Sequence, residues 1–285
     1  QLTDALKNVE FFLVFQPQFS LDGSDNIRGF EALIRWRSSR GVISPMEFIP
    51  LAEKTGLIIP IGKWVMQTAC QMFQKLCEQY DLDALVSVNI SAVQMRDEGF
   101  IQSVKDVLEE TRLDPCRLEL EITESMLIDS PEETVQLLKE LKALGIHISL
   151  DDFGTGYSSL NYLKMLPIDT LKIDKTFVDD IAAELYSKKL LGDMIHMAHH
   201  LNLLVVAEGV ETQEQLEFLR ATGCDYAQGY LLGRPIEMKA IQELVARINE
   251  ETTRGTGTLA QFDQGDRSLL FAGNQAQPAE RGLSS

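Results

Sequence analysis

Apolar segments typical of β-strands alternate with amphipathic helical segments about eight times in the first 250 or so residues of this chain. An apolar repeat at every second residue indicates a strand, and a repeat at every third or fourth residue indicates a helix. Regular alternation of this kind is typical of a (β/α)8 barrel, which needs about 250 residues. An open doubly wound sheet is the alternative, but no Gly-x-Gly-x-x-Gly follows the first strand. The sequence therefore predicts an α/β fold of the TIM-like barrel type.

The element boundaries follow from these repeats and from turn and capping residues. Strands are expected at Glu10–Phe19, Ile27–Trp36, Ala84–Ile90, Arg117–Ile122, His147–Leu150, Thr170–Asp174, Leu203–Val210 and Asp225–Leu231. Helices are expected at Pro45–Ala52, Gly62–Glu78, Glu98–Thr111, Pro131–Leu144, Ser158–Met165, Lys175–Leu201, Gln213–Thr222 and Met238–Glu250. Only a short turn joins the first two strands, so we expect this pair to be antiparallel.

The barrel is expected to occupy residues 1–250 as one domain. Beyond Glu251 the periodicity stops, and the segments 252–257 and 274–285 are rich in Gly, Ser, Thr, Gln and Ala. Such a composition offers too little apolar surface to form a packed core. We therefore expect residues 251–285 to be a disordered tail or a remnant of cloning.

The acidic composition disfavours several classes of ligand. A formal net charge of −17 argues against binding to nucleic-acid polymers or anionic membranes by charge attraction. The four cysteines are scattered without a Cys-x-x-Cys pair, so neither a zinc ribbon nor a thioredoxin-like site is expected. Reduced thiols and the lack of a long apolar run predict a cytoplasmic domain, or the cytoplasmic portion of a longer membrane-anchored protein.

Polar side chains recur where the strands end. Glu31 lies within the second strand, and the later strands end near Asn89, Glu121, Asp151, Asp152, Lys172, Glu208 and Gln228. The carboxyl ends of barrel strands meet at one rim, where active sites lie. Taken singly, each residue has a structural explanation: Asn89 could cap a turn, Glu121 could pair with an arginine, and Lys172 could lie on the surface. Their recurrence at matching positions favours a functional site.

Clustered carboxylates need a compensating positive charge. Two of them at 4 Å repel by about 4 kcal/mol when the effective dielectric constant is near 20. Lys172 and Arg35 cannot balance five negative charges, whereas one or two Mg²⁺ or Mn²⁺ ions can, and carboxylate and amide oxygens are suitable ligands. The adjacent Asp151 and Asp152, followed by Gly154 and Gly156, suit such an ion; a turn with capping acids is the alternative.

Another candidate metal site has less support. His196, His199 and His200 lie on one expected helix, so zinc is conceivable. An ordinary helix surface is the favoured interpretation.

Short motifs occur in a fixed order between Phe12 and Met238. They are Phe15-Gln16-Pro17, Glu31-Ala32-Leu33-Ile34-Arg35-Trp36, Phe48-Ile49-Pro50-Leu51-Ala52-Glu53, Val88-Asn89-Ile90-Ser91, Glu119-Leu120-Glu121-Ile122-Thr123-Glu124-Ser125, Asp151-Asp152-Phe153-Gly154-Thr155-Gly156-Tyr157, Lys172-Ile173-Asp174, Ala207-Glu208-Gly209-Val210-Glu211 and Gln228-Gly229-Tyr230. In this order and at these spacings they resemble the EAL family of cyclic di-GMP phosphodiesterases. The family has a barrel with an antiparallel first strand, as expected above.

The resemblance implies a role for each matching residue. Glu31, Asn89, Glu121 and Asp151 would hold one metal ion, while Asp151 and Asp152 would serve a second, with Glu208 close to it or acting through water. Lys172 would orient or deprotonate the attacking water, and Glu124 would anchor the loop after Asp152. Arg35 would hold a substrate phosphate, Gln16 and Gln228 would contact the dinucleotide or its site, and Glu211 would support the residues in contact with it.

The implied reaction is the Mg²⁺- or Mn²⁺-dependent hydrolysis of cyclic di-GMP to linear 5′-pGpG, with two ions per site. The alternatives are a catalytically silent cyclic di-GMP receptor and a hydrolase of another phosphate ester. Silent members usually lack a metal ligand, whereas every ligand position is filled here. The resemblance also implies a homodimer through the loop after Asp152, fused sensor or regulatory domains, and no nucleic-acid polymer as partner.

Small departures from the family pattern lie at Phe15, where tyrosine is usual, at Gln18, where an apolar residue is common, and at Arg37-Ser38-Ser39. None is a proposed metal ligand.

Overall fold

Eight strands close into a barrel in the part of the chain that the computed structural model describes, namely residues 2–24, 26–39, 41–127, 131–154, 163–179, 181 and 185–254. Around the ring they lie in the order β1-β9-β8-β7-β6-β5-β4-β2, and pairing of β2 with β1 closes it. Their bounds are β1 Phe11–Ser20, β2 Ile27–Ser38, β4 Leu85–Asn89, β5 Leu118–Thr123, β6 His147–Phe153, β7 Thr170–Ile173, β8 Leu204–Ala207 and β9 Tyr226–Ala227. A short strand, β3 (Gly41–Ile43), extends the outer end of β2. The predicted barrel is confirmed.

The first strand runs against its neighbours on both sides. β1 is antiparallel to β2, with Gln16 opposite Glu31, and it is also antiparallel to β9. The other neighbours within the ring are parallel. A short connection can join only antiparallel strands, so the few residues between Ser20 and Ile27 account for this departure from a uniform parallel barrel.

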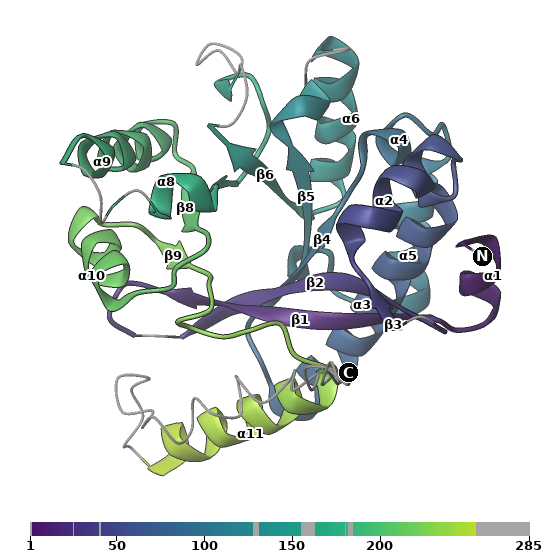
Figure 1. Ribbon diagram of the computed structural model, residues 1–285, viewed down its shortest axis with the longest axis horizontal. Coiled ribbons are helices and arrows are strands. Elements are labelled where there is room, and N and C mark those ends of the chain that lie inside the picture. The colour runs from purple at the N-terminus through teal and green to yellow at the C-terminus, as the bar shows by residue number, and fades with distance from the viewer. Residues whose placement is uncertain are drawn as a thin grey trace, which may run out of the picture.

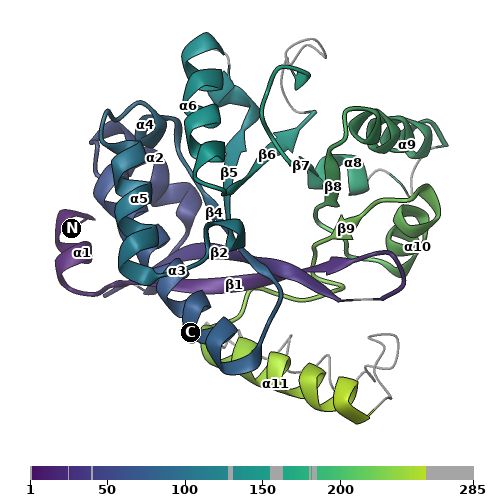
Figure 2. The ribbon, with the colours of Figure 1, turned by 180° about the vertical axis from the view of Figure 1, so that it is seen from behind.

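Helices surround the barrel (Figure 1). In that view α6 lies above it, α9 and α10 lie to the left, and α11 lies below β1; from behind, α3 and α5 lie on the side opposite α9 and α10 (Figure 2). The helices are α1 Leu2–Lys7, α2 Pro45–Lys54, α3 Ile58–Tyr80, α4 Ala92–Met95, α5 Phe100–Thr111, α6 Pro131–Ala143, α8 Lys175–Asp179, α9 Leu185–His200, α10 Gln213–Thr222 and α11 Met238–Arg254, with 3-10 turns η1 Pro115–Arg117 and η2 Glu124–Leu127.

The outer face of the barrel is apolar and packs against the helices. Phe30 of β2 packs edge-on against Phe73 of α3, with ring centroids 6.3 Å apart, and both rings are fully buried. The barrel interior, by contrast, contains buried polar side chains at alternate strand positions, such as Glu119 and Glu121 of β5 or Thr170 and Lys172 of β7. This polar lining leads from the interior to the carboxyl ends of the strands.

Several predicted boundaries are wrong. The single helix expected at Lys175–Leu201 is two helices, α8 and α9, because the continuous helical repeat does not reveal the break after Asp179. The last strand is only β9, two residues long, and the backbone then turns at Gly229, where a Cβ atom would lie 2.2 Å from the Val210 backbone. α11 continues to Arg254, beyond the predicted end.

Some predictions lie outside the described residues: most of the segment Ser158–Met165, the part of the proposed dimer loop that follows Gly154, and the tail from residue 255. Among the described helices, none has both the length and the hydrophobicity needed to cross a bilayer.

Candidate active site

A bulge in β6 brings two adjacent acids to the rim of the barrel. The pairing of β6 with β7 shifts register between Leu150 and Phe153, and Asp152 has a left-handed backbone with φ of 56°. Adjacent strand residues normally face opposite sides of a sheet, and the bulge breaks that alternation. Asp151 is buried and Asp152 is half-buried, and the Asp152 amide donates a 2.9 Å hydrogen bond to Asp151 Oδ1. The strand thus continues through both acids to Phe153, rather than ending before them as predicted.

Lys172 lies at the centre of the strand-end acids. The side chain is buried on β7, and Nζ lies 2.8 Å from Glu121 Oε2 and 2.7 Å from Glu208 Oε1. Asp151 Oδ1 lies 3.4 Å from the same nitrogen, and Glu31 Oε2 lies at 3.8 Å. The predicted convergence of these side chains is therefore present, and one ammonium group faces four acidic side chains that come from β2, β5, β6 and the residue after β8.

Two amide side chains hold the carboxylate of Glu31. Asn89 Nδ2 donates to Oε1 at 2.7 Å, and Gln228 Nε2 donates to Oε2 at 2.6 Å. Asn89 is the last residue of β4, and Gln228 follows β9. Two residues about 140 positions apart in the sequence thus donate hydrogen bonds to the two oxygens of one carboxylate. A buried carboxylate with a hydrogen bond to each oxygen is fixed in orientation.

Burial and charge act in opposite directions on these groups. Burial would lower the pKa of Lys172, but the surrounding carboxylates, Asp151 and Glu121 foremost, raise it well above its usual value. Burial would raise the pKa of Glu31, yet the charge of Lys172 and the hydrogen bonds from Gln228 and Asn89 lower it. For Glu121, burial and the nearby charge of Glu31 dominate, so its pKa is raised well above the ordinary range. Lys172 is therefore an ammonium and Glu31 a carboxylate, while Glu121 tends to hold a proton.

The pKa values of the two acids at the edge of this cluster are also raised. Burial, opposed by Lys172 and reinforced by Asp151, raises the pKa of Glu208 to about 8. Burial and the charge of Asp151 raise the pKa of Asp152. Since one ammonium cannot balance five acids, protons supply the missing positive charge in the metal-free protein.

The remaining predicted residues lie at the margins of the cluster. Gln16 is buried, accepting a 3.1 Å hydrogen bond from Gln228 and donating to the Gly233 carbonyl at 3.0 Å. Arg35 is partly buried and donates to the Ile34 carbonyl at 2.8 Å. Glu124 is buried, and its Oε2 accepts a 3.3 Å hydrogen bond from the backbone amide of Gly154, the first residue after β6.

Glu211 pairs with a residue outside the acid cluster. Its side chain is 42% exposed and pairs with Lys175 Nζ at 2.5 Å.

The donor set fits a divalent cation. Glu121 Oε1 is buried and has no hydrogen-bond partner, although a buried carboxylate oxygen normally has one. Carboxylate and amide oxygens are hard ligands of the kind Mg²⁺ and Mn²⁺ prefer. No three acidic, histidine or cysteine side chains among the described residues are already arranged as a metal cluster. The Lys172 ammonium lies among the acids instead, so a cation has to compete with it for their oxygens.

Three interior residues were missed by sequence reasoning. Gln18, Arg28 and Glu119 are buried below the carboxylates and are joined by hydrogen bonds. Glu119 shares the strand face of Glu121, which was a usable signal, whereas nothing local marks Arg28. The acidic partner of His199, absent from its sequence neighbourhood, is Asp225 at 2.9 Å.

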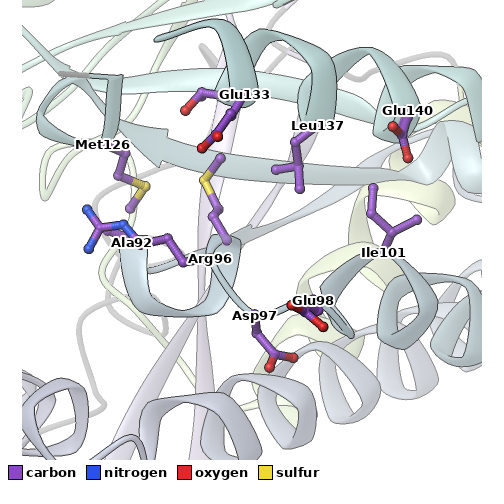
Figure 3. A pocket seen from close by; sticks show the side chains of 11 residues that line it. Ala92, Arg96, Asp97, Glu98, Ile101, Met126, Glu133, Leu137 and Glu140 are labelled. Carbon is purple, nitrogen blue, oxygen red and sulfur yellow. The ribbon is translucent and has the colours of Figure 1, made fainter. Parts of the chain in front are cut away.

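A separate groove lies between α4–α5 and α6, with a volume of about 430 Å³ (Figure 3). Met126 and Leu137 line it, together with acidic side chains such as Glu133 and Glu140. No strand-end residue predicted for the site is among its lining residues.

Known proteins share both this sequence and this fold. The family model of the EAL domain matches residues 1–235. The chain is 44% identical over 245 residues to the signaling protein YkoW of Bacillus subtilis (strain 168), covering 86% of this chain and 30% of that protein. It is 42% identical over 246 residues to the bifunctional diguanylate cyclase/cyclic di-GMP phosphodiesterase MucR of Pseudomonas aeruginosa, covering 86% of this chain and 36% of that protein. The chain thus spans about a third of the length of these relatives.

A solved structure of the PaMucR phosphodiesterase in complex with c-di-GMP matches the fold with a TM-score of 0.81 and 41% sequence identity. The match covers 84% of this chain and 97% of that one. Sequence and fold agree across the barrel, and the chain belongs to the EAL domain family.

Proposed function

We propose that this domain hydrolyses cyclic di-GMP to linear 5′-pGpG in a reaction that depends on two Mg²⁺ or Mn²⁺ ions. The observation that carries the proposal is the buried Lys172 among the acidic side chains of Glu31, Glu121, Asp151 and Glu208, of which Glu121 has a buried oxygen without a hydrogen-bond partner. Support comes from MucR, a relative named as a cyclic di-GMP phosphodiesterase, and from the similar solved domain in complex with c-di-GMP.

The rim residues divide into two ligand groups in this proposal. Glu31, Asn89, Glu121 and Asp151 would hold one ion, while Asp151 and Asp152 would hold the other, with Glu208 beside it or acting through water. When bound, the cations would activate water and neutralise the phosphoryl oxygens. The orientation of Glu31 is already fixed by Asn89 and Gln228, so this carboxylate need not be ordered when a cation binds.

Lys172 fits the role of orienting the attacking water better than that of a base in the metal-free state. The raised pKa keeps its ammonium protonated, and an ammonium can donate a hydrogen bond to a water oxygen but cannot remove a proton. Carboxylates that also bind a cation stabilise the Lys172 ammonium less. Lys172 would therefore lose its own proton more easily in the metal-bound site, and deprotonation of the water by Lys172 would become easier.

The substrate would be held from the margins of the rim. Arg35 would bind a phosphate, because a guanidinium forms paired hydrogen bonds with phosphate oxygens. Gln16 would help to seat the dinucleotide, with Gln228 beside it. Glu124 would anchor the loop after Asp152 through its contact with Gly154, and Glu211 would act from outside the acid cluster.

The reaction transfers one phosphoryl group to water. The water oxygen forms a bond to phosphorus, the bond from phosphorus to the ribose 3′ oxygen breaks, and that oxygen gains a proton. The product keeps the second phosphodiester and carries a new 5′ phosphate. Fixed positions for water, phosphorus and the leaving oxygen would contribute most of the rate advantage.

Regulation would come from the remainder of a longer protein. Relatives are about three times the length of the matched region, so fused sensor or regulatory domains remain part of the proposal. A homodimer through the loop after Asp152 also stays a prediction, because residues 155–162 lie outside the described part of the chain. A cytoplasmic location is proposed on the same footing.

The test is to incubate the domain with cyclic di-GMP and either Mg²⁺ or Mn²⁺, and to resolve the nucleotide products. We expect pGpG from the wild type and a loss of about 100-fold or more in turnover for Asp151→Asn, which removes a charged ligand. Asp83→Asn, at a fully exposed aspartate, is the matched control and should keep wild-type turnover.

The outcomes separate the alternatives. Tight binding of cyclic di-GMP without formation of pGpG would support the silent receptor. Turnover of other phosphate esters alone would support a hydrolase of another phosphate ester. If the domain neither binds nor hydrolyses cyclic di-GMP, the proposal is overturned.

A further inference from the structure

A series of hydrogen bonds between buried polar side chains runs below Glu31, and its two lower members, Gln18 and Arg28, have no role in the proposed reaction. Arg28 Nη1 donates to Gln18 Oε1 at 2.5 Å, and Gln18 Nε2 donates to Gln228 Oε1 at 3.0 Å. Gln228 Nε2 then donates to Glu31 Oε2 at 2.6 Å. Gln18 is fully buried, and the side chain of Arg28 is 6% exposed. The chain therefore connects the barrel interior to a proposed metal ligand through three hydrogen bonds.

A β-bulge places Arg28 inside the barrel. Gln18 pairs with Gly29, but the next residue of β1 pairs with Ile27, so β2 carries Arg28 as an extra residue. Without the bulge, Arg28 would alternate with Gly29 and face the surrounding helices. Gly29 leaves the space free for its neighbours, because a Cβ atom there would lie 2.4 Å from the Leu85 carbonyl oxygen.

The guanidinium of Arg28 is held firmly in this position. It contacts both carboxylate oxygens of Glu119, at 2.5 and 3.1 Å, and donates to Thr170 Oγ1 at 2.9 Å. Ser87 Oγ also donates to Glu119, at 2.9 Å, and the ring of Tyr226 lies 4.9 Å from the guanidinium carbon. A paired guanidinium and carboxylate, both buried, form a rigid base for the chain above them.

The groups at the two ends of this series of hydrogen bonds determine which side chain donates and which accepts at each step. A guanidinium can only donate hydrogen bonds, so Gln18 must turn its carbonyl towards Arg28 and its amino group towards Gln228. Gln228 must then accept through its carbonyl and turn its own amino group towards Glu31, whose carboxylate can only accept. The guanidinium of Arg28 and the carboxylate of Glu31 thus determine the orientation of both amides.

We propose that Gln18 and Arg28 are positioning residues, which orient the Gln228 amide so that it donates to Glu31 and holds that carboxylate in place for the metal. This inference rests on the proposed function for its metal, but the orientation of the amide does not depend on turnover. Reversal of Gln228 would put a carbonyl oxygen 2.6 Å from a carboxylate oxygen, which would repel Glu31 from its place.

Gln18→Glu is the discriminating substitution. It keeps the side-chain size and still accepts from Arg28, but a carboxylate cannot donate to Gln228 and so favours the reversed amide. Gln18→Leu only removes the link. Gln215→Leu is the matched control. Gln215 is also buried, but its hydrogen bonds go to the backbone of Val178, Glu211 and Thr212 and not to the series that joins Arg28 to Glu31.

The first readout is Mn²⁺ binding by calorimetry without substrate. We expect affinity to fall about tenfold in Gln18→Glu, at the lower end of the range typical of residues that support metal ligands, and by less, about threefold, in Gln18→Leu. Gln215→Leu should lower the melting temperature yet keep wild-type affinity. Nearby negative charge alone would strengthen cation binding, so Gln18→Glu binding Mn²⁺ as tightly as the wild type, or more tightly, would overturn the inference.

The second readout needs neither metal nor activity. A crystal structure of metal-free Gln18→Glu should show the contact between Gln228 and Glu31 broken, and an unchanged contact would overturn the inference. A wild type that binds no Mn²⁺ would contradict the proposed function, and the crystal structure would still decide the role of Gln18.

Discussion

At the scale of single residues, the proton on Glu208 links the state of the site to pH. Its pKa of about 8 means that the metal-free protein carries this proton at neutral pH, next to the Lys172 ammonium. The unfolded chain releases the same proton near pH 4.5. The folded state therefore binds the Glu208 proton more tightly than the unfolded chain does. As the pH rises from about 4.5 to about 8, Glu208 makes the metal-free protein less stable.

A cation must displace this proton, so metal binding should depend on pH. We expect the apparent affinity for Mg²⁺ to rise between about pH 6 and pH 8 and to level off above the Glu208 pKa. Calorimetry in two buffers of different ionisation enthalpy should detect protons released on binding, and Glu208→Gln should release fewer. An affinity that stays constant from pH 6 to pH 9 would contradict this account of the site.

At the scale of structural elements, the bulge of β6 determines which acids reach the rim. Asp152 has a left-handed backbone, which costs a residue with a Cβ atom about 1 kcal/mol or more. The same distortion breaks the alternation of the strand at these two acids. Asp151 Oδ1 lies 3.4 Å from Lys172 Nζ, and the half-buried Asp152 carboxyl lies close enough to Asp151 for that charge to raise its pKa. Strain in this strand thus accompanies the placement of two proposed ligands.

This strain can be measured by comparing two substitutions at one position. Asp152→Gly and Asp152→Ala both remove the carboxylate, but only glycine adopts positive φ without cost. We expect the glycine variant to be about 1 kcal/mol more stable to denaturant than the alanine variant in EDTA, with turnover lost equally in both.

Asp106, within the helix α5, supplies the control. There the order should reverse, with Asp106→Ala about 1 kcal/mol more stable than Asp106→Gly. Equal stabilities of the two Asp152 variants would mean that the backbone is not strained.

The elements themselves were predictable to different degrees. The hairpin of β1 and β2 and the helix caps carry local signals, such as the Thr212–Gln215 capping box and the Gly223 cap of α10. The break between α8 and α9 and the two-residue β9 carry none, because tertiary contacts decide where those elements end. Bulges also escape prediction, since a register shift depends on the partner strand.

At the scale of the whole molecule, alternating strands and helices were enough to predict the barrel, and the barrel then predicted which acids meet. Asn89, Glu121, Asp151, Lys172 and Glu208 do converge, because each stands near the end of a strand, and Glu31 joins them from within β2. The polar interior below them was not predictable. The partners of Arg28 come from β1, β5 and β7, and no local pattern brings Gln18, Glu119 and Thr170 together.

The central claim is that this barrel directs water onto a phosphorus atom of cyclic di-GMP. The most direct measurement is mass spectrometry of the product formed in ¹⁸O-labelled water during less than one turnover. We predict linear pGpG with one ¹⁸O atom in its new 5′ phosphate and none in the ribose 3′ hydroxyl. Label in the 3′ hydroxyl, or a linear product without label, would contradict the claim.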